Sequence, residues 1–198
     1  MIRRFGEAAL LVDLDSAAQA QALAASLRDD PPAGMLEAVP GLESLLVELD
    51  PLAGDSEAVA GLIERRLRSL PERPPNGRLH TIRVAYGGPD LEDVAQVTGL
   101  APSEVIARHA AHELRVLFCG FAPGFAYLGE LAPELRVARL ATPRTRTAPG
   151  SVAIAGSMSA IYPADLPGGW RVIGRAEVVL FDPRSDRPRA DMRWPSRA

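Results

Sequence analysis

The sequence predicts two domains, a small α+β domain over residues 1–77 and a mainly β domain over residues 78–198. Three observations support this prediction. Residues 1–70 follow the order strand, strand, helix, strand, strand, helix, which is typical of helices packed on one face of a small antiparallel sheet. Residues 71–77, Pro-Glu-Arg-Pro-Pro-Asn-Gly, disfavour both helix and strand. From residue 114 onward, glycine and proline interrupt short apolar runs, a pattern typical of a small closed β barrel.

Apolar periodicity and capping residues predict the elements of the first domain. Ser16 has a side chain suited to cap a helix, and small or apolar residues recur along one face of the segment that follows it. Prolines beyond each helical pattern mark where it stops. The predicted elements are a hairpin over residues 2–14, a helix over 16–27, strands over 35–39 and 44–49, and a helix that begins at residue 55 or 56 and ends before residue 71.

The second domain is predicted to begin with a strand, continue through two short helices and end in a series of short strands. Gly99 separates the two helical patterns, as expected for a residue that ends a helix. The predicted elements are a strand over residues 79–86, helices over 91–97 and 102–111, and strands over 114–119, 151–155, 171–174 and 178–181.

All basic residues other than histidine are arginine, because the 22 lysine and arginine positions include no lysine. This composition excludes several kinds of chemistry. The chain has no lysine to form a Schiff base or to carry biotin. It also has no phosphate-binding loop of the Gly-Lys-Ser/Thr type and no Ser-Ser-Lys amidase triad.

The bulk composition predicts a globular cytoplasmic protein, with 47% hydrophobic and 24% charged residues. No apolar stretch approaches the roughly 18 residues that span a bilayer. Cys119, the single cysteine, lies in an apolar run and is predicted to be a buried thiol. Arginines outnumber acidic residues over 130–198, which indicates either an anion-binding region or a simple balance to the acidic first half.

Three other functional patterns are weak. Residues 90–109 imitate a helix-turn-helix, but their acidic residues would face DNA phosphates, so we predict no DNA binding. His109 and His112 have helical spacing but no third ligand at a suggestive distance in the sequence, so we predict no metal site. The segment around Ser157 lacks the Gly-x-Ser-x-Gly pattern of a nucleophilic serine.

The candidate site lies between residues 118 and 175, where glycine, proline, arginine and aromatic residues are dense. Arg144 and Arg146 alternate, so in an extended chain their guanidinium groups would project to one side and suit a carboxylate or phosphate. Tyr127, Tyr162 and Trp170 are suited to form flat walls with polar tips. The alternative interpretation is a β barrel whose turns need glycine and proline and whose arginines are solvated.

Several phrases in this region resemble one family, known as the B-type subunit of 5-oxoprolinase, allophanate hydrolase subunit 1 or the Kip-type inhibitor of a sporulation histidine kinase. The phrases occur in the family's order and span nearly the whole chain. They are Tyr86-Gly87-Gly88, Gly120-Phe121-x-Pro123-Gly124-Phe125-x-Tyr127-Leu128, Pro143-Arg144-Thr145-Arg146 with Gly150-Ser151-Val152-Ala153-Ile154, and Pro167-Gly168-Gly169-Trp170. The resemblance implies a cyclophilin-like β barrel for the second domain and a small α+β first domain.

The resemblance also implies a function. The chain would be part of an ATP-dependent complex that opens 5-oxoproline to L-glutamate, with ATP used at the level of the complex. Its partners would be an allophanate hydrolase subunit 2-type protein, which is the C-type component of 5-oxoprolinase, and a lactam-opening A-type component, and the isolated chain would be inactive. On chemical grounds, the residues predicted to hold the carboxylate or phosphate are Arg144, Arg146, Ser151 and Arg171, those predicted to form the pocket wall are Tyr127 and Tyr162, and His109 is a candidate proton carrier.

Two alternative functions stay open. The chain could be a non-catalytic regulatory module that inhibits a sensor histidine kinase, or a component of an allophanate or urea-related amidohydrolase, although the lack of lysine disfavours the amidase. The sequence also departs from the family at Met158, Ala160 and Leu166, where relatives usually carry glutamine, glycine and serine. Loss of an amide and a hydroxyl removes groups that a polar substrate would use, so the sequence leaves the substrate open.

Overall fold

The computed structural model describes residues 1–71, 77, 79–182 and 184. The chain divides into two compact units, Met1–Gly77 and Arg78–Ala198. Each unit has its own hydrophobic core. No helix among the described residues combines the length and apolar character needed to cross a membrane.

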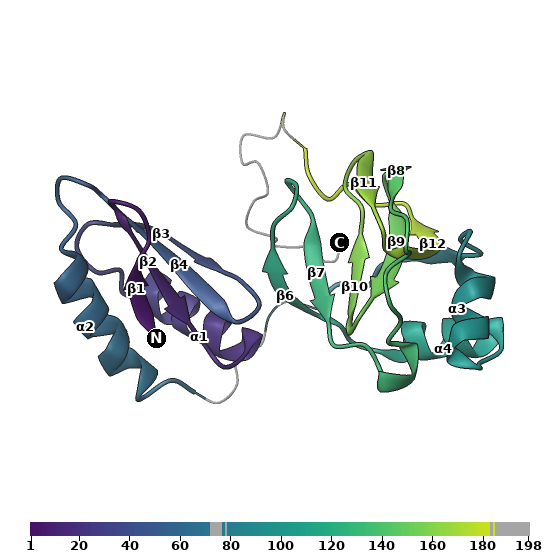
Figure 1. The fold of residues 1–198 in the computed structure, drawn as a ribbon, viewed down its shortest axis with the longest axis horizontal. Helices are drawn as coiled ribbons and strands as arrows, with labels where there is room; N and C mark the ends of the chain where they lie inside the picture. Colours follow the sequence, from purple (N-terminus) through teal and green to yellow (C-terminus); the bar gives the residue numbers. More distant parts are fainter. Residues whose placement is uncertain (72–76, 78, 183, 185–198) are drawn as a thin grey trace. The chain divides into compact units, whose positions relative to one another are not determined.

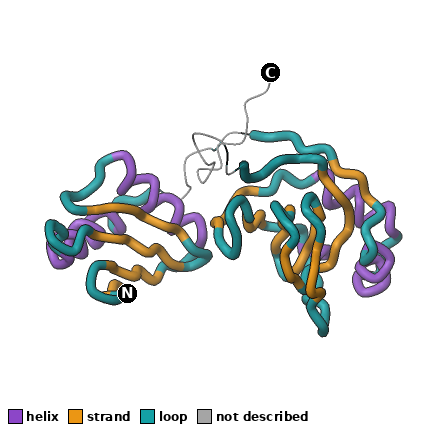
Figure 2. The backbone as a smooth tube through the Cα atoms, turned by 90° about the horizontal axis from the view of Figure 1, so that it is seen from above, coloured by secondary structure: helices purple, strands orange, loops and turns teal. Residues whose placement is uncertain are grey.

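The first unit is an antiparallel sheet with two helices on one face, which confirms its predicted α+β class (Figures 1 and 2). Side chains at alternate strand positions, such as Leu10 and Val12 or Leu45 and Val47, pack against Leu23 and other helix residues. In sheet order the strands are β1 (Ile2–Arg4), β2 (Ala9–Asp13), β4 (Ser44–Leu49) and β3 (Met35–Pro40), and the helices are α1 (Ala17–Asp29) and α2 (Ser56–Leu67).

Both helices of this unit begin at the predicted capping residues. The Ser16 hydroxyl accepts a hydrogen bond from the Gln19 amide at 3.2 Å. The Asp55 carboxylate accepts two, from the amides of Glu57 and Ala58, each at 3.0 Å. These bonds satisfy amide groups that have no partner within the helix, which is why short polar residues start helices.

The second unit contains a six-stranded antiparallel sheet and a separate two-stranded ladder (Figure 1). In sheet order, the six strands are β5 (Val84–Tyr86), β12 (Arg171–Ala176), β9 (Ser151–Ala155), β10 (Met158–Ile161), β7 (Ala126–Gly129) and β6 (Arg115–Cys119). The two-stranded ladder pairs β11 (Leu166–Gly168) with β8 (Arg144–Thr147). The helical elements are α3 (Leu91–Thr98), α4 (Pro102–Ala111) and the short 3-10 helix η1 (Pro133–Leu135).

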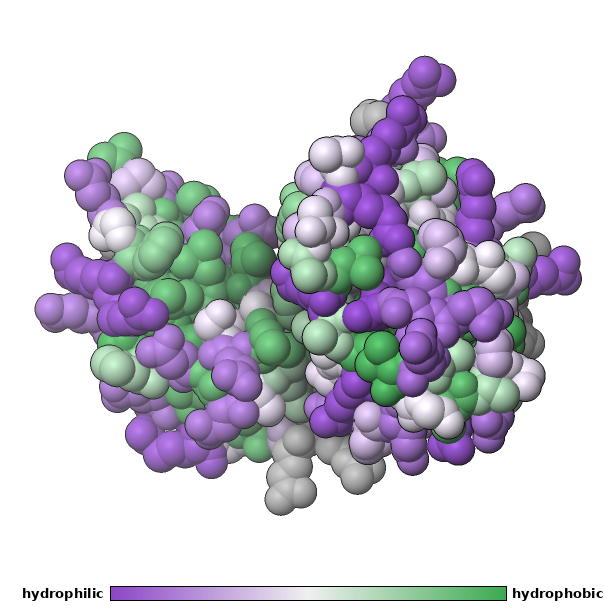
Figure 3. All heavy atoms as spheres, turned by 45° about the vertical axis from the view of Figure 1, so that its right-hand side comes forward, coloured by the Kyte–Doolittle hydropathy of each residue, from purple (hydrophilic) through white to green (hydrophobic). Residues whose placement is uncertain are grey.

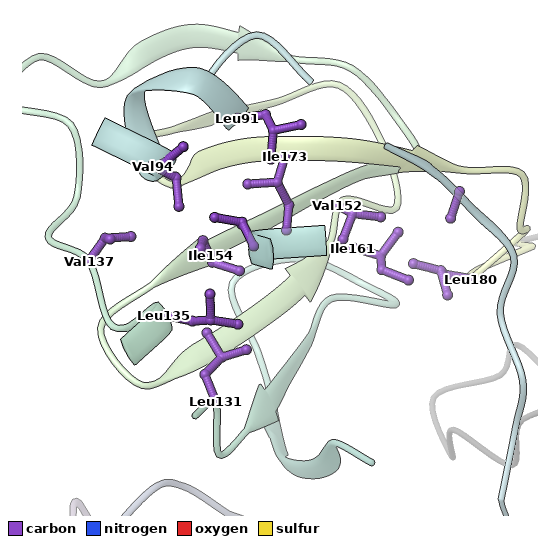
Figure 4. Packing of buried hydrophobic residues seen from close by; sticks show 13 residues of the cluster. Leu91, Val94, Leu131, Leu135, Val137, Val152, Ile154, Ile161, Ile173 and Leu180 are labelled. Atoms are coloured by element: carbon purple, nitrogen blue, oxygen red, sulfur yellow. The ribbon is translucent and has the colours of Figure 1, made fainter. Parts of the chain in front are cut away.

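The six-stranded sheet buries side chains on both of its faces. On one face, Val152 and Ile154 of β9 join a core formed with α3, α4 and η1, in which Leu91, Val94 and Leu135 also lie (Figure 4). The intervening residues of β9, such as Ala153, point to the other face and pack in a second cluster that is rich in aromatic residues. Strand β9 is therefore buried along its whole length.

The closed barrel predicted from the sequence is not found. Among the described residues, β5 and β6 are the two edges of the six-stranded sheet, and no ladder joins them. Closure of a barrel requires such a ladder. The prediction relied on short strands punctuated by glycine and proline, which open antiparallel sheets share with barrels. Residues 178–181, predicted as a strand, have no regular secondary structure.

The surface carries scattered apolar side chains among hydrophilic ones, as one face of the molecule shows (Figure 3). The exposed apolar residues include Leu36, Leu52, Phe121 and Val179. Phe121 also has a positive φ of 71°, which is uncommon for a residue other than glycine.

Two glycines in left-handed turns provide a test of how tightly the sheet is packed. A Cβ at Gly150 would overlap the carbonyl oxygen of Ala176, whereas a Cβ at Gly156 would meet nothing within 4 Å. Both have positive φ, so alanine at either costs about 1 kcal/mol in backbone strain. We expect Gly156→Ala to lose about that much stability in denaturant unfolding and Gly150→Ala at least twice as much. Equal losses would show that the turn at Gly150 relaxes freely.

Candidate functional site

An aromatic cluster occupies the face of the six-stranded sheet opposite α3 and α4. Phe125 lies at its centre, with edge-to-face contacts to Tyr127, Tyr162 and Trp170 at centroid distances of 5.0, 5.3 and 6.1 Å. Tyr127 also contacts Trp170 at 5.7 Å and stacks on Phe118 at 4.1 Å. These geometries are the ones that aromatic rings favour, so the cluster forms a rigid base.

Tyr127 and Tyr162, both predicted as wall residues, are brought together in this cluster. Tyr127 is half-buried and Tyr162 is buried, with 2% of its surface exposed. Burial raises the pKa of each phenol, so both keep their protons near neutral pH and remain hydrogen-bond donors. The hydroxyl of Tyr162 lies so close to Gly168 that a Cβ there would overlap it.

Arg139 is a member of this site that the sequence reasoning missed. Its guanidinium carbon lies 5.9 Å from the centroid of the Trp170 ring, in a cation–π arrangement. Its positive charge opposes the rise in the pKa of both Tyr127 and Tyr162. The available signal was its place in the arginine-rich stretch that leads into the Pro143-Arg144-Thr145-Arg146 phrase.

Arg144 is partly buried and bound to an acid of its own unit. Its Nη2 donates to Asp90 Oδ1 at 2.5 Å, and the other oxygen of Asp90 accepts a hydrogen bond from the Val172 amide at 2.6 Å. The Nη1 atom of Arg144 is buried without a hydrogen-bond partner among the described residues. Asp90 precedes α3 but makes no side-chain cap bond, because its carboxylate serves Arg144 and Val172 instead.

Arg146 and Arg171 are also paired with carboxylates. Arg146 is exposed and donates to Asp165 at 2.6 Å. Arg171 forms an ion pair with Asp93, and its Nε donates to the carbonyl of Ala138 at 2.9 Å. Arg144 and Arg146, predicted to bind one anion together, therefore pair with two different carboxylates, and Arg171 pairs with a third.

The ion-pair partner of Arg171, Asp93, lines a cavity beside α3. This cavity has a volume of about 670 Å³ and contains two carboxylates, those of Glu92 and Asp93. Its lining residues are Pro89, Glu92, Asp93, Ala95, Gln96, Gly99, Leu100 and Pro102. The acidic lining disfavours an anionic ligand there.

Ser151 is buried at the start of β9, and its backbone joins it to the cluster. Its carbonyl accepts a hydrogen bond from the Tyr162 amide at 3.0 Å, and its amide donates to the carbonyl of Ala148 at 3.2 Å.

Cys119, predicted to be buried, is exposed at the end of the edge strand β6. A neighbouring apolar run does not bury the last residue of an edge strand.

His109 lies on the other face of the sheet, apart from the aromatic cluster. Its Nδ1 is 2.8 Å from the Tyr86 hydroxyl and its Nε2 is 3.0 Å from the Ser159 hydroxyl. Because Ser159 donates its own proton to the carbonyl of Ala153, we assign the His109 proton to Nε2, and Nδ1 accepts from Tyr86. Burial, with a smaller effect from His112, lowers the pKa of His109 to about 4, so the ring is neutral at pH 7.

Together, the described residues form an aromatic base that carries one half-buried phenol, that of Tyr127, and the exposed guanidinium of Arg139. Such an arrangement suits a small anion attached to a flat group. No group of three or more histidine, cysteine, aspartate or glutamate side chains in the described part of the chain is placed to hold a metal ion.

Comparison with known proteins identifies the family. The family model described as "Carboxyltransferase domain, subdomain C and D" matches residues 1–190. The chain belongs to this family. A relative from Bacillus subtilis, named as the B-type subunit of 5-oxoprolinase, is 34% identical over 94% of this chain and 86% of its own length. A second relative of the same name, from Escherichia coli O157:H7, is 38% identical over 92% of this chain and 87% of its own length.

The fold of the family is shared by a solved structure, that of TTHA0988. It is similar with a TM-score of 0.77 at 36% sequence identity, and the match covers 95% of this chain. This chain spans only 38% of TTHA0988. The resemblance to the B-type component of 5-oxoprolinase that the motifs indicated is therefore confirmed at the level of the family.

The bond between Asp90 and Arg144 is expected to contribute more stability than the exposed pair of Arg146 and Asp165. Asp90→Ala should cost about 3 kcal/mol in denaturant unfolding, because it leaves a buried amide and a partly buried guanidinium without an acceptor. Arg144→Ala should cost less, since 31% of its side chain is exposed, and the double variant should lose less than the sum of the two. The matched cycle at Arg146 and Asp165 should show no measurable coupling. Additivity at Asp90 and Arg144 would contradict this assignment.

His109 is expected to make the protein less stable in acid. The unfolded histidine takes up a proton near its ordinary pKa of 6.5, whereas the folded one does so only near 4. The stability gained by burying neutral His109 is present above pH 6.5 and is lost as the pH falls toward 4, by about 3 kcal/mol. Between pH 7 and pH 4, the unfolding free energy of wild type should fall by about 3 kcal/mol more than that of His109→Gln. Parallel curves would show that His109 is not buried as a neutral ring.

Proposed function

We propose that this chain is a component of an ATP-dependent complex of the 5-oxoprolinase type, which opens 5-oxoproline to L-glutamate. The observation that carries the proposal is the similarity to two proteins named as B-type components of 5-oxoprolinase over more than nine-tenths of the chain. The proposed site of action is the cytoplasm. ATP is used by the complex, and no nucleotide site is assigned to this chain.

Two further proteins complete the proposed complex, an allophanate hydrolase subunit 2-type protein, which is the C-type component of 5-oxoprolinase, and a lactam-opening A-type component. The lettered names of the relatives support a multi-subunit assembly. TTHA0988 supports it from another direction, because there the region similar to this chain occupies only 38% of a longer polypeptide. A domain of this family is thus covalently joined to further sequence in that protein.

The chemistry of the reaction explains why donors held in place are needed. A lactam is a poor electrophile, so its oxygen must be activated, for which a phosphoryl group from ATP is suited. ADP leaves as the phosphoryl group passes to the lactam oxygen. Water then attacks the ring carbon and the C–N bond breaks, with a proton taken up by the nitrogen, and a second water releases phosphate from the resulting acyl phosphate. Negative charge develops near the ring during these steps. The half-buried Tyr127 supplies a protonated phenol on a rigid base, so it can donate a hydrogen bond without rearranging, and the buried Tyr162 supports that base.

The other predicted site residues take different parts in this proposal. Arg144 binds Asp90, and its Nη1 is buried without a hydrogen-bond partner among the described residues. Arg146 and Arg171 bind acids of their own unit, and Ser151 positions β9 against Tyr162. His109 fixes α4 to the sheet through Tyr86 and Ser159 and is not proposed as a proton carrier, because it lies on the opposite face.

Reconstitution tests the proposed function. The purified chain, the C-type partner and the A-type partner are assayed singly and in mixtures for ADP and glutamate formed from ATP and 5-oxoproline. We expect product only in the complete mixture. Absence of 5-oxoproline-dependent ADP in every mixture would reject the proposal, and inhibition of a histidine kinase by the chain alone would replace it with the regulatory function.

A pair of tyrosine variants tests the site within that mixture. Tyr127→Phe removes one donor from the aromatic cluster and should lower kcat/KM for 5-oxoproline by roughly 3- to 10-fold, the effect of one neutral hydrogen bond. Tyr86→Phe removes the same group from the opposite face, where it binds His109, and serves as the matched control. It should reduce stability and leave kcat/KM unchanged. Equal losses of kcat/KM in both variants would show that the activity does not depend on the aromatic cluster.

A further inference from the structure

Arg139 differs in its pairing from the arginines predicted to bind the ligand. Arg144, Arg146 and Arg171 each bind a carboxylate of their own unit. Arg136, three residues before Arg139, does the same with Glu130 at 3.3 Å. Arg139 has no carboxylate partner within the described part of the chain, and its cation–π contact is with Trp170. Its charge is therefore available to an external anion.

The loop that carries Arg139 is fixed on both sides of this residue. The carbonyl of Ala138 accepts a hydrogen bond from Arg171 Nε at 2.9 Å. The amide of Leu140 donates to the carbonyl of Gly169 at 2.7 Å. Both partners are direct sequence neighbours of Trp170, so the same short segment holds the loop and the ring over which Arg139 lies. Because the backbone on both sides of Arg139 is held in place, less conformational entropy is lost when its side chain binds a ligand.

Aromatic residues surround Arg139, and Trp170 is the one it contacts. Trp170 is buried, with 5% of its surface exposed, and Phe125 and Tyr127 support its ring from the side. Tyr127 and Arg139 both contact the Trp170 ring, at 5.7 and 5.9 Å, and the charge of Arg139 opposes the rise in the pKa of Tyr127 and of Tyr162. The exposed Arg139 and the half-buried Tyr127 thus lie on a base formed by the buried rings of Trp170, Phe125 and Tyr162.

We propose that Arg139, above the Trp170 ring and beside Tyr127 and Tyr162, binds the carboxylate of a small ligand that carries this group on a flat ring. A guanidinium binds a carboxylate through two parallel hydrogen bonds, which fixes both its position and its orientation. The half-buried Tyr127 hydroxyl then donates to another oxygen of the ligand, whose ring lies against the partly exposed pair of Tyr127 and Phe118.

This inference rests on the proposed function, because 5-oxoproline is a ring amide with one carboxylate. It reassigns carboxylate recognition from Arg144, Arg146 and Arg171 to Arg139. The paired arginines would have to release an acid before they could bind a ligand, and two of these acids, Asp90 and Asp93, belong to the N-terminal end of α3. Arg139 needs no such exchange.

Binding to the full chain tests the assignment directly. The chain is labelled with ¹⁵N, and the indole and guanidinium N–H signals are followed during titration with 5-oxoproline. The same titration with 2-pyrrolidinone, which has the ring amide without the carboxylate, tests the role of the anion. We expect 5-oxoproline to shift the Trp170 and Arg139 signals, 2-pyrrolidinone to have no such effect, and Arg139→Gln to weaken binding about 10- to 100-fold.

Two further variants separate ligand binding from a structural role of Arg139. Arg136→Gln removes a nearby arginine that already binds Glu130 and should keep the affinity of wild type. Arg139→Lys keeps the charge but not the paired donors and should fall between wild type and Arg139→Gln. In the reconstituted mixture, Arg139→Gln should raise KM for 5-oxoproline and change kcat little. A merely structural Arg139 would lower the melting temperature and leave KM unchanged.

The outcomes distinguish this inference from the proposed function. If no mixture turns over 5-oxoproline but the chain binds it through Arg139, the proposed function fails and the site stands. If the mixture is active and Arg139→Gln has the KM of wild type, the site is wrong and the function stands. Equal binding of 2-pyrrolidinone, equal affinity of wild type and Arg139→Gln, or no binding together with an unchanged KM would each overturn the inference.

Discussion

The burial of β9 on both faces is the constraint on which the second unit depends. Successive side chains of a strand point to opposite sides, so Val152 and Ile154 join the core beneath α3 and α4, while Ala153 and Ala155 face the aromatic cluster. This division also separates the polar groups. His109 reaches the helix-covered face, where burial keeps it neutral, and Tyr162 reaches the other.

The pairing of charges follows from the packing of the helices and loops around this sheet. Asp90 and Asp93, at the start of α3, bind Arg144 and Arg171, which come from strands far along the chain. A lysine-free protein depends on arginine for every such contact, and the planar guanidinium suits carboxylates well. Arg139 is left to Trp170, and this difference gives the site its available positive charge.

Much of the local structure was predictable because it depends on neighbouring residues. The caps at Ser16 and Asp55, the α+β class of the first unit and the two short helices around Gly99 follow from side-chain chemistry within a few positions. The closed barrel and the burial of Cys119 were predicted wrongly, since strand order and edge position depend on long-range pairing. Tyr127 and Tyr162, predicted to share a pocket wall, lie in one cluster, and Arg139 was not among the predicted residues.

The sequence by itself determined the family, because several phrases of glycine, proline, arginine and aromatic residues occur in a fixed order over the chain. It also determined which residue types were available for binding an anion. Only the tertiary structure decided which of these arginines pair with carboxylates and which one lies over Trp170. The pairing of Arg144 depends on Asp90, a carboxylate 54 positions away, and no local pattern encodes that distance.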